Sequence, residues 1–131
     1  MDSDKIKHLE LIQSVVDRQG RNSFSLKGWS VIIVTAILAL SVETGGSRLV
    51  WLAYIPSITF WGLDAYYLLQ EKLFRDLYDA VRLGEPVKPF SMDCSDYVEK
   101  SDSWFKVVRS VSVLWFHLPI VLVISVIIYI T

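Results

Sequence analysis

The sequence contains very little cysteine, and long stretches of it carry no charge. Cys94 is the one cysteine among 131 residues, which excludes an intrachain disulfide and a thiol metal cluster. Residues 28–42 and 111–130 contain no Asp, Glu, Lys or Arg. Hydrophobic residues make up 53% of the chain and charged residues 21%. A soluble domain of this size could not bury so much apolar surface, so the composition predicts an integral membrane protein.

The chain also lacks an excess of basic charge and a secretory signal. A net charge of −1 gives no field that would attract nucleic acid, so no nucleic-acid partner is expected. The first 23 residues are polar and mixed in charge, without the apolar core and cleavage site of a signal peptide. We therefore expect the first apolar segment to insert into the bilayer and to remain in the protein.

The polar N-terminal segment is expected to form an amphipathic cytoplasmic helix over residues 3–20. Its apolar side chains recur at spacings of three and four residues, which places them on one stripe: Ile6, Leu9, Ile12 and Val16. Ser3 and Asp4 are suited to cap its start, and Gly20 and Asn22 are expected to end it.

Three segments that follow are apolar and long enough to cross a membrane as helices. They cover residues 24–42, 49–69 and 110–130. Pro56 and Gly62 predict a kink in the second segment, which neighbouring helices can accommodate. The predicted fold class is therefore all-α, with three transmembrane helices forming a single membrane domain over residues 1–131.

The second span is expected to continue into the cytoplasm as a helix over residues 70–84, followed by a cytoplasmic linker over residues 85–103. One stripe of this extension is apolar: Leu69, Leu73, Leu77 and Val81. An amphipathic helix must bury such a stripe. Because two short helices form too small a core, we predict that the stripe packs between subunits of a homo-oligomer, with help from the N-terminal helix. The alternative is that both helices lie on the bilayer surface.

The distribution of Lys and Arg predicts the orientation in the membrane. Five of the 13 basic residues precede the uncharged part of the first span, which begins at residue 28, one (Arg48) lies between the first two spans, and seven lie between the second and third. Basic residues are retained on the cytoplasmic side. The N-terminus and the central region are therefore expected inside, and the turn at Gly45 and the C-terminus outside.

Three polar side chains are expected within or beside the spans at similar depth: Lys27, Asp64 and His117. Counting 1.5 Å per residue from the ends of the spans places Asp64 and His117 in the inner leaflet, with Lys27 at the same boundary. Ionisable groups in a membrane usually face a partner or water. The cluster is interpreted as a clasp between helices, with a polar lining for an ion or proton path as the alternative.

No arrangement of residues predicts catalysis or metal binding. His8 and His117 are far apart in the chain and suggest no zinc site. No nucleophile, base and orienting group can be assigned together. We therefore expect a protein that is not an enzyme, with no catalytic residue, no metal and no cofactor.

Several runs of residues resemble a family of small bacterial membrane proteins. They are HLELIQSVVDR at residues 8–18, NSFSLKGW at 22–29, FWGLDAYYL at 60–68, PFSM at 89–92 and FHLP at 116–119. The chain is similar to the RipA-like octameric membrane proteins, although His117 stands where an aromatic residue such as Tyr is expected. The resemblance covers most of the chain. It implies a bacterial inner-membrane homo-oligomer, with eight copies, and assigns no catalytic residue.

The sequence thus predicts a homo-oligomer in the bacterial inner membrane whose partners are the lipid bilayer and its own copies. The preferred function is a pore or transport element with a cytoplasmic helical collar. The alternative is a non-conducting scaffold that recruits a cytoplasmic protein partner.

Overall fold

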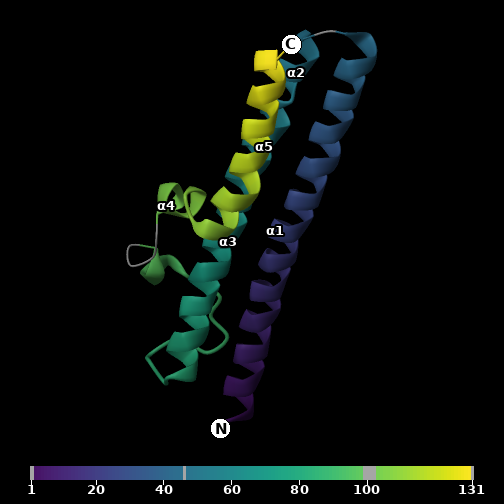
Figure 1. The fold of residues 1–131 in the computed structure, drawn as a ribbon. Helices are drawn as coiled ribbons and strands as arrows, with labels where there is room; N and C mark the ends of the chain where they lie inside the picture. The colour runs from purple at the N-terminus through teal and green to yellow at the C-terminus, as the bar shows by residue number, and fades with distance from the viewer. Residues whose placement is uncertain (1, 46, 99–102, 131) are drawn as a thin grey trace.

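The computed structural model describes residues 2–45, 47–98 and 103–130, whose regular structure is entirely helical (Figure 1). The elements in chain order are α1 (Ser3–Thr44), α2 (Ser47–Leu52), α3 (Tyr54–Arg82), the short 3-10 helix η1 (Ser95–Tyr97), α4 (Trp104–Val108) and α5 (Val111–Ile130). Two helices, α1 and α5, are long and apolar enough to cross a membrane.

Helix α1 runs without interruption through Gly20 and Asn22, so the predicted end of the N-terminal helix is wrong. Its cap is Asp2, whose carboxylate accepts a hydrogen bond from the Asp4 backbone amide, and not Ser3 or Asp4. Its buried side chains contact different helices along its length. Leu9, Ile12 and Val16 pack on α3, and Ser23 bonds to Asp64 of α3. Val34 packs near Val50 of α2 and Ile124 of α5. A helical glycine costs about 1 kcal/mol relative to alanine. Packing on both sides of Gly20 outweighs that cost and keeps the helix intact.

The predicted second span is divided at Ala53 into α2 and α3. The proline ring at Pro56 has no N–H to donate to the carbonyl of Leu52, and the Ala53 amide turns back to Val50 O at 3.1 Å. Gly62, in contrast, lies within unbroken α3. A Cβ at Gly62 would lie 3.4 Å from the Trp104 ring, whose Nε1 donates to Gly62 O at 3.1 Å. Gly62 therefore allows α4 to approach α3 closely.

Helix α3 extends to Arg82, as the expected continuation of the second span requires, and Gly84 ends it. Gly84 has φ 79°, and the amide of Glu85 bonds to Ala80 O at 2.9 Å. A glycine in the left-handed conformation is a common way for a helix to end. The linker then folds back on the helices, where its side chains pack on the cluster formed by α1 and α3: Val87, Cys94 and Tyr97.

Helices α1 and α3 are antiparallel neighbours, and α5 rises beside α2 and α3 (Figure 1). The α1–α2 turn and the end of α5 lie at one end of the molecule, and the start of α1 and the end of α3 lie toward the other. Helices α1, α2 and α5 meet near the first of these ends in a small apolar cluster of Val34, Val50, Ala53 and Ile124.

Candidate functional site: a buried ion-pair cluster

The structure brings Lys27, Asp64 and His117 together, each from a different helix. Asp64 on α3 is 0% exposed, and its Oδ2 lies 2.6 Å from Lys27 Nζ on α1 and 2.8 Å from His117 Nε2 on α5. His117 is also 0% exposed, and the Lys27 side chain is 18% exposed. The three side chains that were expected to lie near one another therefore form one site.

Sequence reasoning missed a fourth member of the site, Ser23. Its hydroxyl donates to Asp64 Oδ1 and accepts a hydrogen bond from Lys27 Nζ at 2.9 Å. Ser23 lies one helical turn before Lys27, on the same face of α1. The four-residue spacing between Ser23 and Lys27 could have identified it. The N-terminal helix was expected to end before Ser23, so the two residues were not expected on one helix.

Three donors from the same chain fill the hydrogen-bonding positions of the Asp64 carboxylate. An ammonium, an imidazole N–H and a hydroxyl surround its two oxygens. Removing one member of such a buried pair leaves the other charge uncompensated, which is strongly unfavourable. The cluster therefore fixes α1, α3 and α5 in one relative position.

Aromatic rings cover the cluster. The Trp61 ring stacks on the His117 ring, with centroids 6.0 Å apart and planes inclined by 9°. Trp61 Nε1 donates to Val108 O at 3.1 Å, which holds the indole between α3 and α4. Lys27 Nζ lies 5.9 Å from the centroid of the Phe116 ring. These apolar rings lower the local dielectric constant around Asp64 and His117, while Lys27 remains partly exposed.

Further polar atoms lie buried near the cluster without a hydrogen-bond partner among the described residues: Ser30 Oγ, Ser57 Oγ and His117 Nδ1. Ser30 lies seven residues beyond Ser23 on α1, and Ser57 lies seven residues before Asp64 on α3. Because the two helices are antiparallel, both steps of two turns lead to the same level of the interface. The polar character of the α1–α3 interface thus continues beyond the cluster.

The apolar stripe of α3 is covered within the chain, which corrects the reason for expecting an oligomer. Leu77 and Val81 pack with Leu9, Ile12 and Val16 of α1, and Leu73 is 5% exposed. Leu69 is half-buried beside Ala65 and Val107. The sequence allowed for the N-terminal helix as a partner, and α1 takes that place. Burial of this stripe needs no second copy.

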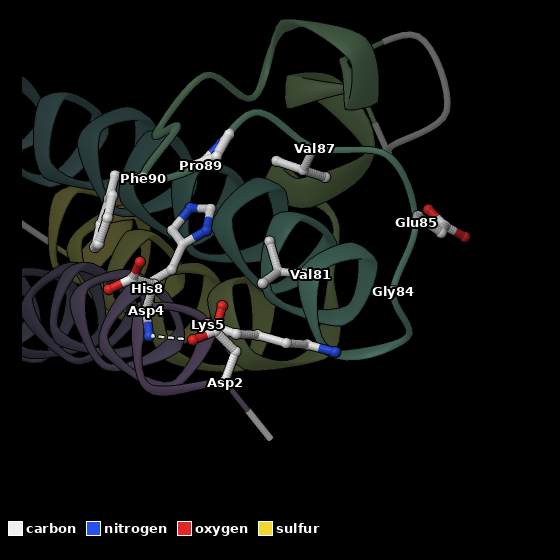
Figure 2. A pocket seen from close by; sticks show the side chains of 10 residues that line it. All are labelled: Asp2, Asp4, Lys5, His8, Val81, Gly84, Glu85, Val87, Pro89 and Phe90. Atoms are coloured by element: carbon white, nitrogen blue, oxygen red, sulfur yellow. Dashed lines mark hydrogen bonds between the residues drawn. The ribbon is translucent and has the colours of Figure 1, made fainter.

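A pocket of about 250 Å³ lies at the other end of the α1–α3 pair, where the linker returns (Figure 2). His8 projects from α1 toward Pro89 and Phe90, and its Nε2 is 2.7 Å from Ser91 O. Phe90 adopts φ 58°, a left-handed conformation that is unusual for a bulky residue. This bond and the contact between the His8 and Phe90 rings attach the linker to α1.

The chemistry of the cluster favours charge compensation and proton exchange over nucleophilic attack. Lys27 bound to an ionised Asp64 is an ammonium, which has no lone pair with which to activate Ser23. Among the described residues, no group of three or more His, Cys, Asp or Glu side chains is placed to hold a metal ion.

Neither a family model, nor a curated protein, nor a solved structure matches this chain. The resemblance to the RipA-like proteins therefore stays a prediction from the sequence runs. The cluster itself carries the functional argument.

Proposed function

We propose that this chain is a three-span integral membrane protein that acts as a transport element, with the Lys27–Asp64–His117 cluster as its working site. The observation that carries the proposal is the fully buried Asp64 carboxylate between two candidate membrane helices, α1 and α5, and α3. Charged side chains are expensive in a bilayer, and where they occur they commonly mark ion or proton pathways.

We propose that ions or protons cross inside each chain and not through an open aqueous pore between copies. Lys27, Asp64 and His117 all point into the helix bundle. The outer faces of the apolar helices present large hydrophobic side chains, among them Trp29, Ile32, Ile58, Trp115 and Leu122. Such faces suit lipid or another apolar helix and would not hydrate a pore.

The functional test is ion and proton flux in liposomes and current in planar bilayers. We expect the wild-type protein to give flux above protein-free liposomes. Asp64→Glu should change the rate, because it keeps the charge and moves the carboxylate, whereas Asp79→Glu on the exposed face of α3 should not. Absence of flux and current at any applied voltage would overturn the transport proposal.

The orientation proposed is N-terminus inside and C-terminus outside, in a bacterial inner membrane. Its support is the count of basic residues and the arrangement of the helix ends, because the α1–α2 turn and the end of α5 lie together. A reporter active only outside the cytoplasmic membrane should work when fused after Thr131, which lies outside the described residues, and fail when inserted beside Cys94. The reverse pattern would contradict the topology.

Assembly into a homo-oligomer, with eight copies, is proposed on the family resemblance. An apolar groove between α1 and α5 supports close packing with another helix in the membrane. Its lining includes Val31, Thr35, Leu38, Pro119 and Val123. Particle mass in mild detergent tests this directly, and a monomeric mass at all protein concentrations would overturn it.

The second candidate function is a non-conducting scaffold. The observation that favours it is the cytoplasmic end of the molecule, where α1, α3 and the linker pack into one unit through Leu77 and His8. A protein partner recovered with the wild-type chain and lost when His8→Ala releases the linker would support the scaffold, provided that no current is found.

A further inference from the structure

We propose that His117 is a proton-binding site, in which Nδ1 takes one proton and the resulting imidazolium replaces the Lys27 ammonium as the partner of Asp64. This inference deepens the proposed function, because it names the proton as the transported species and His117 as the group that carries it. The titration itself does not depend on transport, so the two claims can fail separately.

The first step is the tautomer of the imidazole. Asp64 faces Lys27 Nζ at 2.6 Å and is therefore an ionised carboxylate, which only accepts hydrogen bonds. His117 Nε2 lies 2.8 Å from the same oxygen and must carry the hydrogen atom. In a neutral imidazole the other nitrogen then has a free lone pair. That nitrogen, His117 Nδ1, is buried and has no partner among the described residues.

The second step is the charge of the cluster. With Lys27 as an ammonium, Asp64 as a carboxylate and His117 neutral, the buried charges cancel. A proton from water that binds Nδ1 forms a new N–H bond and leaves two cations facing one carboxylate oxygen, Oδ2. Like charges at this distance repel strongly in an interior of low dielectric constant. One of the two cations must therefore withdraw.

The third step identifies Lys27 as the group that withdraws. His117 is 0% exposed and is held by its backbone within α5 and by the Trp61 ring. The Lys27 side chain is already 18% exposed and lies one turn from exposed Phe24, near the end of the apolar segment. A long lysine side chain can extend along the helix and place its ammonium at the membrane surface.

Among the residues that the structure describes, few other titratable groups face the imidazole. Helix α1 contributes Lys27 and α3 contributes Asp64, both in direct contact with the site. The basic residues of the α4 region, Lys106 and Arg109, are exposed to solvent, and Arg109 bonds to Phe105 O. Protonation of His117 is therefore governed by the competition between it and Lys27 for Asp64.

Histidine-selective ¹⁵N NMR of the full chain in lipid nanodiscs tests this inference. The chain has two histidines, so His8→Gln assigns the signals. At pH 8 we expect His117 to carry its hydrogen on Nε2. Acidification from pH 8 to about 4.5, which includes the range where histidine usually changes charge, should convert it to the doubly protonated ring. Over the same pH interval, the Lys27 ammonium should become accessible to solvent.

The decisive variant is Lys27→Met, which removes the competing cation. A neighbouring like charge disfavours the charged form of a histidine, so this change should increase the fraction of doubly protonated His117 observed at a fixed mildly acidic pH. Lys88→Met, on the exposed linker, is the matched control and should leave that fraction unchanged. An unchanged fraction in Lys27→Met would overturn the competition between the two cations.

The wild-type spectra decide the remaining points even where Lys27→Met does not fold. A hydrogen on Nδ1 at pH 8, or a His117 ring that does not titrate down to pH 4.5, overturns the proton site. Proton flux through liposomes with a His117 that does not titrate would remove this inference alone. A titrating His117 in a protein without flux would remove the transport function and leave the proton site intact.

Discussion

The α1–α3 interface has an apolar half and a polar half, and the two are held by different forces. The apolar half consists of Leu9, Ile12, Val16, Leu77 and Val81, packed near the start of α1. The polar half consists of Ser23 and Lys27 of α1 with Asp64 of α3, which also contacts His117 of α5. It lies where the uncharged segment of α1 begins. The same pair of helices thus changes its mode of packing along its length.

Under the proposed membrane topology, the difference follows from the solvent that would surround each half. In water, burial of an apolar stripe is favourable because it removes hydrocarbon from the solvent. In a bilayer, lipid is as apolar as leucine, so apolar burial no longer selects one arrangement of the helices. Polar contacts such as the Asp64 cluster can then specify the arrangement, since each unpaired member would be unfavourable in hydrocarbon.

The largest expected effect is that of Asp64→Asn in the polar half. The amide keeps the size of the side chain but leaves Lys27 without a counter-ion, which should lower stability by about 3–5 kcal/mol. Thermal unfolding in detergent measures it. Asp79→Asn is the matched control, because Asp79 lies in an exposed ion pair with Arg82, 3.4 Å away. A silent Asp64→Asn would mean that Asp64 reaches water at the membrane surface.

A smaller loss is expected in the apolar half from Leu77→Ala. Leu77 is 1% exposed, and truncation of a buried leucine leaves a cavity that costs about 3 kcal/mol. Leu83 directly follows α3 and is 65% exposed, so Leu83→Ala should change the melting temperature little. Equal effects of the two substitutions would show that α1 does not cover this stripe in solution.

A matched pair of serines on α1 separates partnered from unpartnered hydroxyls within the polar interface. Ser23→Ala removes a hydroxyl bonded to Asp64 and Lys27 and should lower stability by about 1–3 kcal/mol. Ser30→Ala removes a buried hydroxyl that has no partner among the described residues and should be neutral or stabilising. The same loss from both would contradict the assignment of Ser23 to the cluster.

The smallest expected effect is on the rate of chemical labelling of Cys94, which packs against the apolar half. Burial, with smaller contributions from the Asp93 and Asp76 carboxylates, raises the pKa of Cys94 to about 11. At pH 7 the reactive thiolate is therefore about 100-fold scarcer than at the ordinary value, and maleimide labelling should be slow. The rate should increase as the pH approaches 11.

Two substitutions test whether the labelling rate of Cys94 responds to the apolar half of the interface and not to the polar half. Leu77→Ala loosens the cluster on which Cys94 packs and should accelerate labelling at pH 7. Ser23→Ala acts in the other half and should leave the rate unchanged. Acceleration by both would show that the two halves open together.

The helical stripes and the depth of the polar residues could be predicted from the sequence, because both depend on regular spacing. Such spacing predicts that Lys27, Asp64 and His117 lie close together and that α3 extends beyond the apolar segment. The uninterrupted α1 was not, because Gly20 and Asn22 are local signals, whereas the packing that overrides them is with α3, far along the chain. Coverage of Leu77 by α1 depends on the same long-range contact.

The central claim is that Lys27 and Asp64 form an ion pair that holds the helices in one chain. A charge-swap cycle measured by thermal unfolding in detergent tests it most directly. Asp64→Lys and Lys27→Asp should each lower the melting temperature, because each places like charges 2.6 Å apart in the wild-type geometry. The double variant restores opposite charges and should recover part of the loss. Equal melting temperatures for Asp64→Lys and the double variant would contradict the ion pair.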